Sequence, residues 1–244
     1  MTRGARREAA SRSVFRIGLV SATLWACDPL ASPEYLGEPL ASIKGSVASW
    51  STPPQGPADL VVLYIDYGPI QSTGLGERVP VTESFPVGFS IPLMAPPATD
   101  ALNDIPGEGE PRIGIAWFVV LRSGAAKPGP FLTHEDFKGL ENGDVLGWAE
   151  DSILTYVDGE AAEGSTASEI LGGPKATGFH LMAVQGKLAE DASCSLVCDT
   201  STMREVDMAS TTVMVSLSAD PSTLRIPTFR LPDRVEDAFG ITTR

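Results

Sequence analysis

Histidine is scarce in this chain of 244 residues, because only His134 and His180 are present. A serine or cysteine hydrolase would need one of them as its general base, and the chain has neither a Gly-x-Ser-x-Gly elbow nor a Ser-x-x-Lys motif. Glu135 follows His134, but Lys138 stands where the metalloprotease motif HExxH requires a second histidine. We therefore predict that the protein is not an enzyme.

Phosphate-binding loops of the GxxxxGK[ST] type and dinucleotide fingerprints are also missing from the sequence. The strand and helix pattern that such loops require is missing as well, so we predict no cofactor. A pair of catalytic carboxylates cannot be read from sequence, because the two acids meet in space and not at a fixed spacing. A carboxylate-dependent hydrolase acting on envelope polysaccharide or peptide therefore stays open as an alternative.

Basic residues are few and unevenly placed in the chain. Five of the 18 cations but only one of the 31 acids lie in residues 1–26, so the remainder carries a formal charge near −17. Such a surface repels nucleic acid and anionic lipid headgroups. We therefore predict no nucleic-acid partner.

Long hydrophobic runs are absent, and the apolar run Ile17–Ala26 has ten residues. It is too short for a membrane-spanning helix, which needs on the order of 20 residues. An arginine-rich stretch precedes it, and polar sequence with Pro29 follows it. This order is typical of a cleavable signal peptide, which we place at residues 1–26.

The run ends in Leu24, Trp25, Ala26 and Cys27. An aliphatic residue three places before a cysteine and a small residue just before it resemble the lipobox of bacterial lipoprotein precursors, although Trp25 departs from the small or aliphatic residue usual there. The resemblance implies cleavage after Ala26 and a diacylglycerol on Cys27, which would hold the protein at a membrane on the periplasmic or cell-surface side. Two acyl chains are enough for durable anchoring.

Asp28 directly follows the cysteine, as in the inner-membrane retention signal of enteric lipoproteins, and the choice between inner and outer membrane stays open. Residues 35–47 are similar to the start of predicted lipoproteins of uncharacterised function. We assign residues 27–40, which contain three prolines, to an extended tether, 41–232 to one domain and 233–244 to a polar tail. The stretch 122–144 is a candidate subdomain boundary, and 160–177 is predicted to be a mobile loop.

Alternation of apolar and polar residues with a period of two dominates the domain. It predicts strands at Asp59–Tyr67, Phe85–Leu93, Arg112–Arg122, Val145–Trp148, Ile153–Val157, Phe179–Val184, Thr211–Leu217 and Leu224–Leu231. The first is predicted to be buried on one side, the second to lie at an edge because of Pro86 and Pro92, and the third to be central. A capping box at Thr133 predicts one short helix over His134–Leu140. We predict an all-β fold, an antiparallel β-sandwich of the prealbumin or immunoglobulin type with long loops.

Cys194 and Cys198 are the thiols that remain if Cys27 is acylated, and in an exported protein we expect them to form a disulfide. The spacing does not match a zinc knuckle, so we predict no metal ligands.

Calcium-dependent carbohydrate binding is a further alternative. It rests on two acidic clusters, one of Asp136, Glu141, Asn142 and Asp144 around Gly143 and one of Asp158, Glu160 and Glu163. Neither cluster has the EF-hand spacing. Tyr64, Tyr67, Trp50 and Trp148 would suit an aromatic platform for sugar or peptide. Packing of these residues in the core is the alternative interpretation. The leading hypothesis is a non-enzymatic binding or structural component of the cell envelope, with an envelope protein or polysaccharide as its partner.

Overall fold

A computed structural model describes residues 37–49, 57–65, 78–81, 86–125, 141, 143–185, 189–190, 196–199, 203–218, 220–221, 224 and 228–230. The predicted signal peptide, the first part of the tether, the predicted helix at 134–140 and the tail at 233–244 lie outside these ranges.

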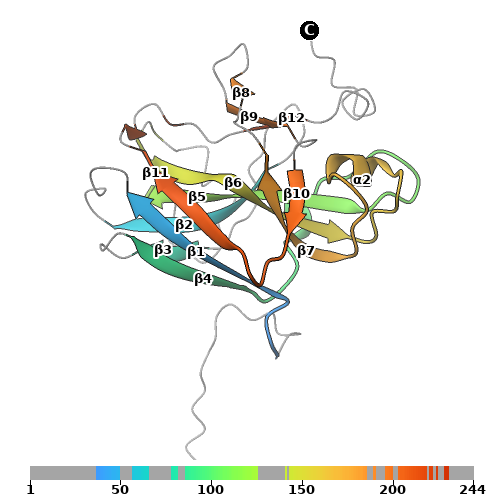
Figure 1. The fold of residues 1–244 in the computed structure, drawn as a ribbon, viewed down its shortest axis with the longest axis horizontal. Coiled ribbons are helices and arrows are strands. Elements are labelled where there is room, and N and C mark those ends of the chain that lie inside the picture. The colour runs from blue at the N-terminus through green and yellow to red at the C-terminus, as the bar shows by residue number, and fades with distance from the viewer. Residues whose placement is uncertain are drawn as a thin grey trace, which may run out of the picture.

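Strands make up most of the described chain (Figure 1). They are β1 (Ala41–Ser49), β2 (Ala58–Ile65), β3 (Arg78–Val81), β4 (Val87–Leu93), β5 (Arg112–Arg122), β6 (Val145–Asp158), β7 (Gly178–Val184), β8 (Ala189–Glu190), β9 (Leu196–Asp199), β10 (Met203–Val206), β11 (Thr212–Leu217) and β12 (Thr228–Arg230). The described helices are short: the 3-10 helix η1 (Thr99–Ala101) and the α-helix α2 (Thr166–Ile170). The prediction of an all-β chain is confirmed.

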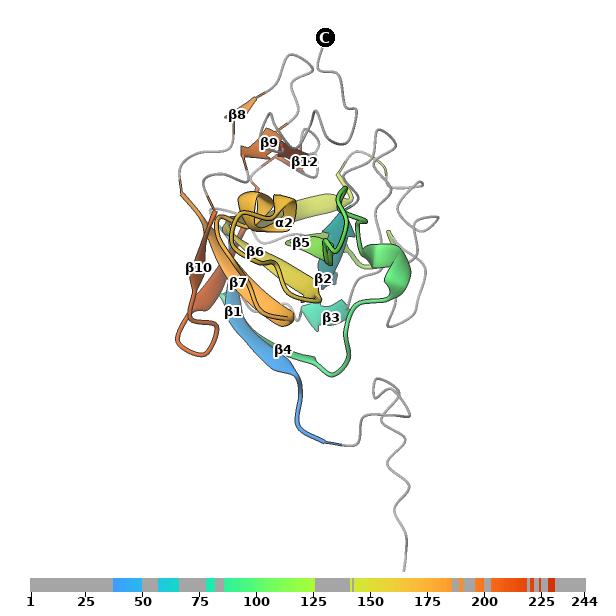
Figure 2. The ribbon, with the colours of Figure 1, turned by 90° about the vertical axis from the view of Figure 1, so that its right-hand side faces the viewer.

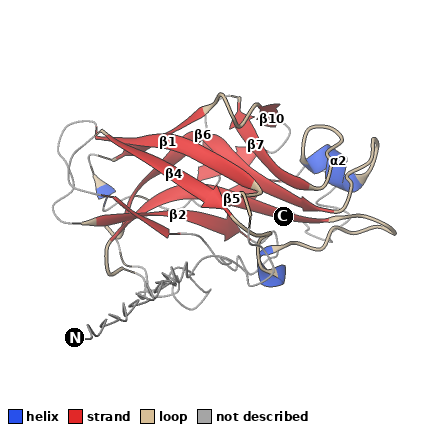
Figure 3. Ribbon diagram, turned by 90° about the horizontal axis from the view of Figure 1, so that it is seen from below, coloured by secondary structure: helices blue, strands red, loops and turns tan. Residues whose placement is uncertain are grey.

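One sheet of nine strands holds most of these elements together. Its main path is β3-β2-β5-β6-β11-β1-β4, and β7 and β10 branch from β6. The two ends of the path, β3 and β4, lie next to each other (Figures 1 and 2), so the sheet curls into a half-barrel (Figure 3). The predicted sandwich of two sheets is not confirmed, because strands of both halves belong to this one curled sheet. The predicted antiparallel order also fails at β1, which pairs with β11 in parallel.

The strand β5 lies between β2 and β6, as predicted for Arg112–Arg122. Ile115 and Trp117 point to the outer face of the curl, whereas Ala116 and Phe118 point to the inner face, and all four are buried. Both faces of this strand are apolar because it lies between two cores.

The inner core fills the curl between its two halves. It joins Ile43 of β1, Ile91 of β4 and Val213 of β11 to residues of β2, β5 and β6. The outer core lies on the other face of β2, β5, β6 and β7, where α2 covers it (Figure 2). The predicted one-sided burial of β2 is therefore wrong, because Val62 faces the inner core and Leu63 the outer one.

The strand β4 lies at one end of the sheet, as its prolines predict. Leu93 accepts a backbone hydrogen bond from Leu40, so the backbone groups of Leu93 point toward β1 and those of Pro92 point outward. Pro86 and Pro92 therefore remove donors from the free edge, which protects the sheet from pairing with another chain. The first described residues of the tether, 37–40, are exposed.

The stretch 160–177, predicted to be a mobile loop, holds α2 instead. Ser165 caps the helix by accepting a hydrogen bond from the amide of Ser168. Glu110 accepts two more, from Thr166 at 2.8 Å and from Ala167 at 3.0 Å. The base of the stretch is closed by a bridge between Ala161 and Lys175. Sequence alone missed this helix because one of its caps comes from a residue 56 positions away.

Candidate functional site

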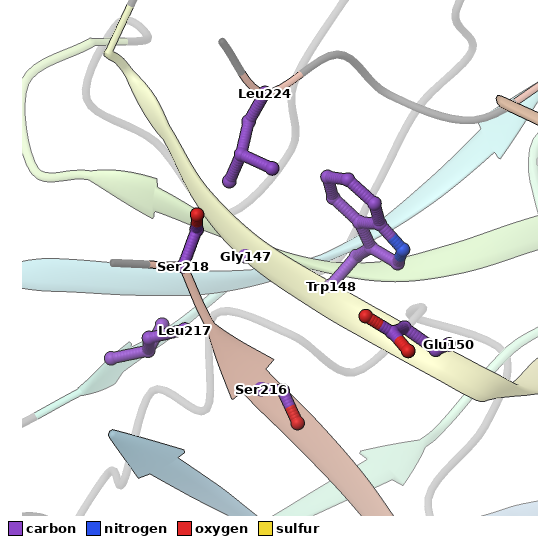
Figure 4. Close-up of a pocket in the computed structure, with 7 residues that line it drawn as sticks. All are labelled: Gly147, Trp148, Glu150, Ser216, Leu217, Ser218 and Leu224. Atoms are coloured by element: carbon purple, nitrogen blue, oxygen red, sulfur yellow. The ribbon is translucent and has the colours of Figure 1, made fainter. Parts of the chain in front are cut away.

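A groove of about 320 Å³ opens between β6 and β11 (Figure 4). It is lined by Gly147, Trp148, Glu150, Ser216, Leu217, Ser218 and Leu224. Its volume falls at the lower end of the range for small-molecule sites, roughly 300–1,000 Å³.

The groove forms where the sheet branches. The strand β6 pairs with β11 only at Trp148 and Gly147, and from Ser152 onward it pairs with β7. Between the two partners, the register of β6 against β5 shifts by several residues. The exposed Glu150 and Asp151 occupy this shift, which explains why the sequence pattern predicted two strands where β6 is one strand of 14 residues.

Gly147 allows β11 to approach β6 closely. A β-carbon at this position would lie 2.1 Å from the carbonyl oxygen of Ser216 and 2.9 Å from the Cα of Leu217. Both atoms belong to the backbone, so a side chain here would require β11 to move. One more hydrogen bond, from the amide of Ser218 to the carbonyl of Leu146 at 2.9 Å, closes the strand pair.

Trp148 supplies the floor of the groove. Its side chain is buried, with 5% of the residue exposed, yet its indole Nε1 has no hydrogen-bond partner among the described residues. An unsatisfied buried donor costs about 1–3 kcal/mol. A donor of this kind in the wall of a groove is a group that a ligand with an acceptor oxygen could satisfy.

The rim of the groove is polar. Ser216 and Ser218 are half-buried and Glu150 is exposed. In Figure 4 the nitrogen edge of Trp148 lies on the side of Glu150, and Leu224 lies beyond the other part of the ring. Two hydroxyls, one carboxylate and one indole N–H thus surround a small apolar floor. Glu150 is the one carboxylate among the described lining residues, whereas glycoside hydrolysis uses a pair.

A second group of ionisable side chains joins β7, β10 and the end of the 160–177 stretch. The carboxylate of Glu205 lies 2.7 Å from Nδ1 of His180 and 3.5 Å from Nζ of Lys175. Burial raises the pKa of Glu205, but the hydrogen bond and charge of His180 and the charge of Lys175 outweigh it and hold that pKa below its ordinary value. Nε2 of His180 lies 2.8 Å from the carbonyl oxygen of Ala176. Both ring nitrogens are thus engaged, and we assign the group a structural role.

The residues predicted for anchoring and for the disulfide are mostly beyond what the structure describes. Ala26, Cys27 and Cys194 lie outside the described residues, and so does His134. Cys198 lies on β9, which pairs with β8 and β12 in a separate three-stranded sheet above the outer core (Figures 1 and 2). The lipid attachment and the disulfide therefore stay predictions.

The two acidic clusters considered for calcium are not assembled by the described residues. The carboxylate of Asp144 accepts a hydrogen bond from the amide of Glu141, and that of Asp158 pairs with Arg112. Asp136 and Asn142 lie outside the described residues. Within the described ranges no three His, Cys, Asp or Glu side chains are placed to share a metal ion.

The aromatic residues considered as a platform separate. Tyr64 is buried in the inner core and Trp148 lines the groove, while Trp50 and Tyr67 lie outside the described residues. Sequence reasoning missed Glu150, Ser216 and Ser218. The signal for Glu150 was present, because the two acids at 150–151 interrupt an otherwise apolar pattern.

No family model, curated protein or solved structure matches this chain. Among the described residues, no helix has the length and apolarity needed to cross a membrane.

Proposed function

We propose that this chain is a lipid-anchored, non-enzymatic binding component of the bacterial cell envelope and that the groove at β6 and β11 is its binding site. The single observation that carries the binding role is the buried indole N–H of Trp148, a lining residue of the groove, which has no hydrogen-bond partner within the part of the chain that the structure describes. The lipobox-like run ending at Cys27 supports the anchor. The lipid would hold the domain at the periplasmic or cell-surface side of a membrane, and the partner would be an envelope protein or polysaccharide.

The anchor is tested by replacing the predicted lipid attachment residue. Cys27→Ser should move the full chain from the detergent phase to the aqueous phase on phase partitioning, because it removes both acyl chains. Cys198→Ser is the matched control and should stay in the detergent phase. A Cys27→Ser protein that still partitions with detergent would contradict the anchor.

The binding role is tested with the detergent-solubilised full chain and insoluble envelope material from its own cells. We expect co-sedimentation of the wild type and a loss with Glu150→Gln, because the groove would lose its rim charge. Glu163→Gln removes an exposed carboxylate elsewhere and should co-sediment like the wild type. Equal co-sedimentation of the two variants would contradict the role of the groove.

A prealbumin-like or immunoglobulin-like sandwich would give a rigid support for a binding site on its surface. In this proposal the curled sheet provides that support. A hydrolase and a calcium-dependent module remain weaker proposals. The described lining residues offer one carboxylate, and of the cluster acids Asp144 is engaged in a turn and Asp158 in an ion pair.

A further inference from the structure

We infer that the ligand of the groove is a neutral sugar chain, which places one residue in the groove and continues over the uncovered outer face of β11, β1 and β4. This inference rests on the proposed function and names the class of ligand. It starts from the groove and then uses the surface beside it.

The backbone of the strand pair that lines the groove is already used. Ser216 pairs with Trp148, Leu217 pairs with Gly147, and the amide of Ser218 bonds to Leu146. A peptide that binds as an added strand needs a free row of backbone donors and acceptors. Recognition here must therefore come from side chains, and hydroxyl groups are ligands that side chains alone can bind.

The side chains of the groove suit hydroxyls and neutral acceptors. The serine hydroxyls both donate and accept, the carboxylate of Glu150 accepts from hydroxyls, and the indole N–H of Trp148 donates to an oxygen. Leu224 offers apolar contact for the C–H groups of a sugar ring, whereas the side chain of Leu217 points into the inner core. The formal charge of −13 and the carboxylate at the rim disfavour phosphate-bearing or acidic ligands.

The surface next to the groove bears little charge. Ser216 lies between Trp148 of β6 and Ala48 of β1, so the groove runs directly onto the outward-facing rows of β1, β4 and β11. In the register, Lys44 lies between Ser90 and Thr212. The described outward rows contain no carboxylate, although the chain has 31 acids.

This face also exposes apolar surface. Met214 is 43% exposed and stands beside Ser46 in the outward rows. A strand of six residues spans roughly 20 Å, which is long enough for several sugar rings laid end to end. Small residues alone would not indicate a ligand, but here they continue from a groove that carries an unsatisfied buried donor.

The test follows the indole N–H signal of Trp148 by NMR. The full chain is labelled with ¹⁵N-tryptophan in detergent, and the signal is assigned with Trp148→Phe. We expect at least one neutral hexasaccharide among chitohexaose, cellohexaose and maltohexaose to shift this signal, in the presence of EDTA. Glu150→Gln should weaken that affinity about tenfold, as loss of a hydrogen bond to a charged group does, and Glu163→Gln should not change it.

The extension over the face is tested separately. Met214→Asp places a carboxylate on the uncovered rows, so it should weaken the hexasaccharide while leaving the response to the corresponding single methyl glycoside unchanged. Equal effects on both would overturn the extension. A Trp148 signal that none of the three neutral sugars moves, or that a hyaluronan hexasaccharide moves at lower concentration, would overturn the neutral-sugar ligand. If the wild type still co-sediments with envelope material and Glu150→Gln does not, the groove remains the binding site and its ligand belongs to another class.

Discussion

Replacing Gly147 with alanine should break the contact that forms the groove. The added β-carbon would lie 2.1 Å from the carbonyl oxygen of Ser216, far inside van der Waals contact, and the neighbouring atom is backbone that cannot rotate away. Overpacking of this kind costs about 1–3 kcal/mol. Displacing β11 also weakens the hydrogen bond from the amide of Ser218 to the carbonyl of Leu146, which contributes about 1 kcal/mol to stability.

The expected loss in the free energy of unfolding is therefore about 2–4 kcal/mol. In a domain of this size such a loss lowers the melting temperature by on the order of 10 °C. Urea unfolding followed by circular dichroism measures the loss. The groove should also fail to bind envelope material at temperatures where the variant is still folded, because Ser216 and Ser218 move with β11.

Gly88→Ala is the matched control. Gly88 also lies in a strand, but the nearest atom to its β-carbon position is a carbonyl oxygen 3.9 Å away, which is ordinary contact. Alanine there should change stability by less than about 1 kcal/mol, in the stabilising direction because it restricts the unfolded chain. If the two variants lose the same stability, the close approach of β11 to β6 does not exist as described.

Three other outcomes are expected. Glu205→Gln should destabilise the protein near neutral pH, and the loss in the free energy of unfolding should shrink as the pH falls below ~4.3. The reason is that a carboxylate whose pKa is lowered by His180 stabilises the fold only while it is ionised. Urea titrations at several pH values measure the loss, and a loss that does not change with pH would argue against this role of Glu205. Glu110→Gln should speed hydrogen exchange of the first amides of α2 by roughly fivefold, consistent with about 1 kcal/mol for a lost cap, and unchanged exchange would refute the capping role. Cys194 and Cys198 should resist thiol labelling of the denatured chain until a reductant is added, and labelling without it would exclude the disulfide.

Local patterns were sufficient to predict much of the sheet. Alternation placed Arg112–Arg122 at the centre with two apolar faces, and the prolines placed β4 at an edge. These features depend on period and on missing donors, which are properties of a short segment. The pairing of β1 with β11 depends on residues about 170 positions apart, so no local pattern could reveal it.

The same limit applies to the groove. Trp148 is a candidate binding residue from sequence, but Ser216 and Ser218, which line the groove with it, lie on β11 and directly after it, some 70 residues later. Gly147 looks like an ordinary glycine until β11 is placed against it. The branching of the sheet at β6, which creates the site, is a property of the whole topology and has no signature in any one segment.

Photo-crosslinking in living cells tests whether the groove binds envelope glycan. A photoreactive amino acid replaces Ser218 in the groove or, as the control, the exposed Glu163, in the otherwise native full chain. After irradiation and membrane fractionation, we predict that the chain carrying the probe at position 218 is recovered with envelope glycan attached and that the chain carrying it at position 163 is not. Equal attachment from both positions, or none from position 218, would contradict the account.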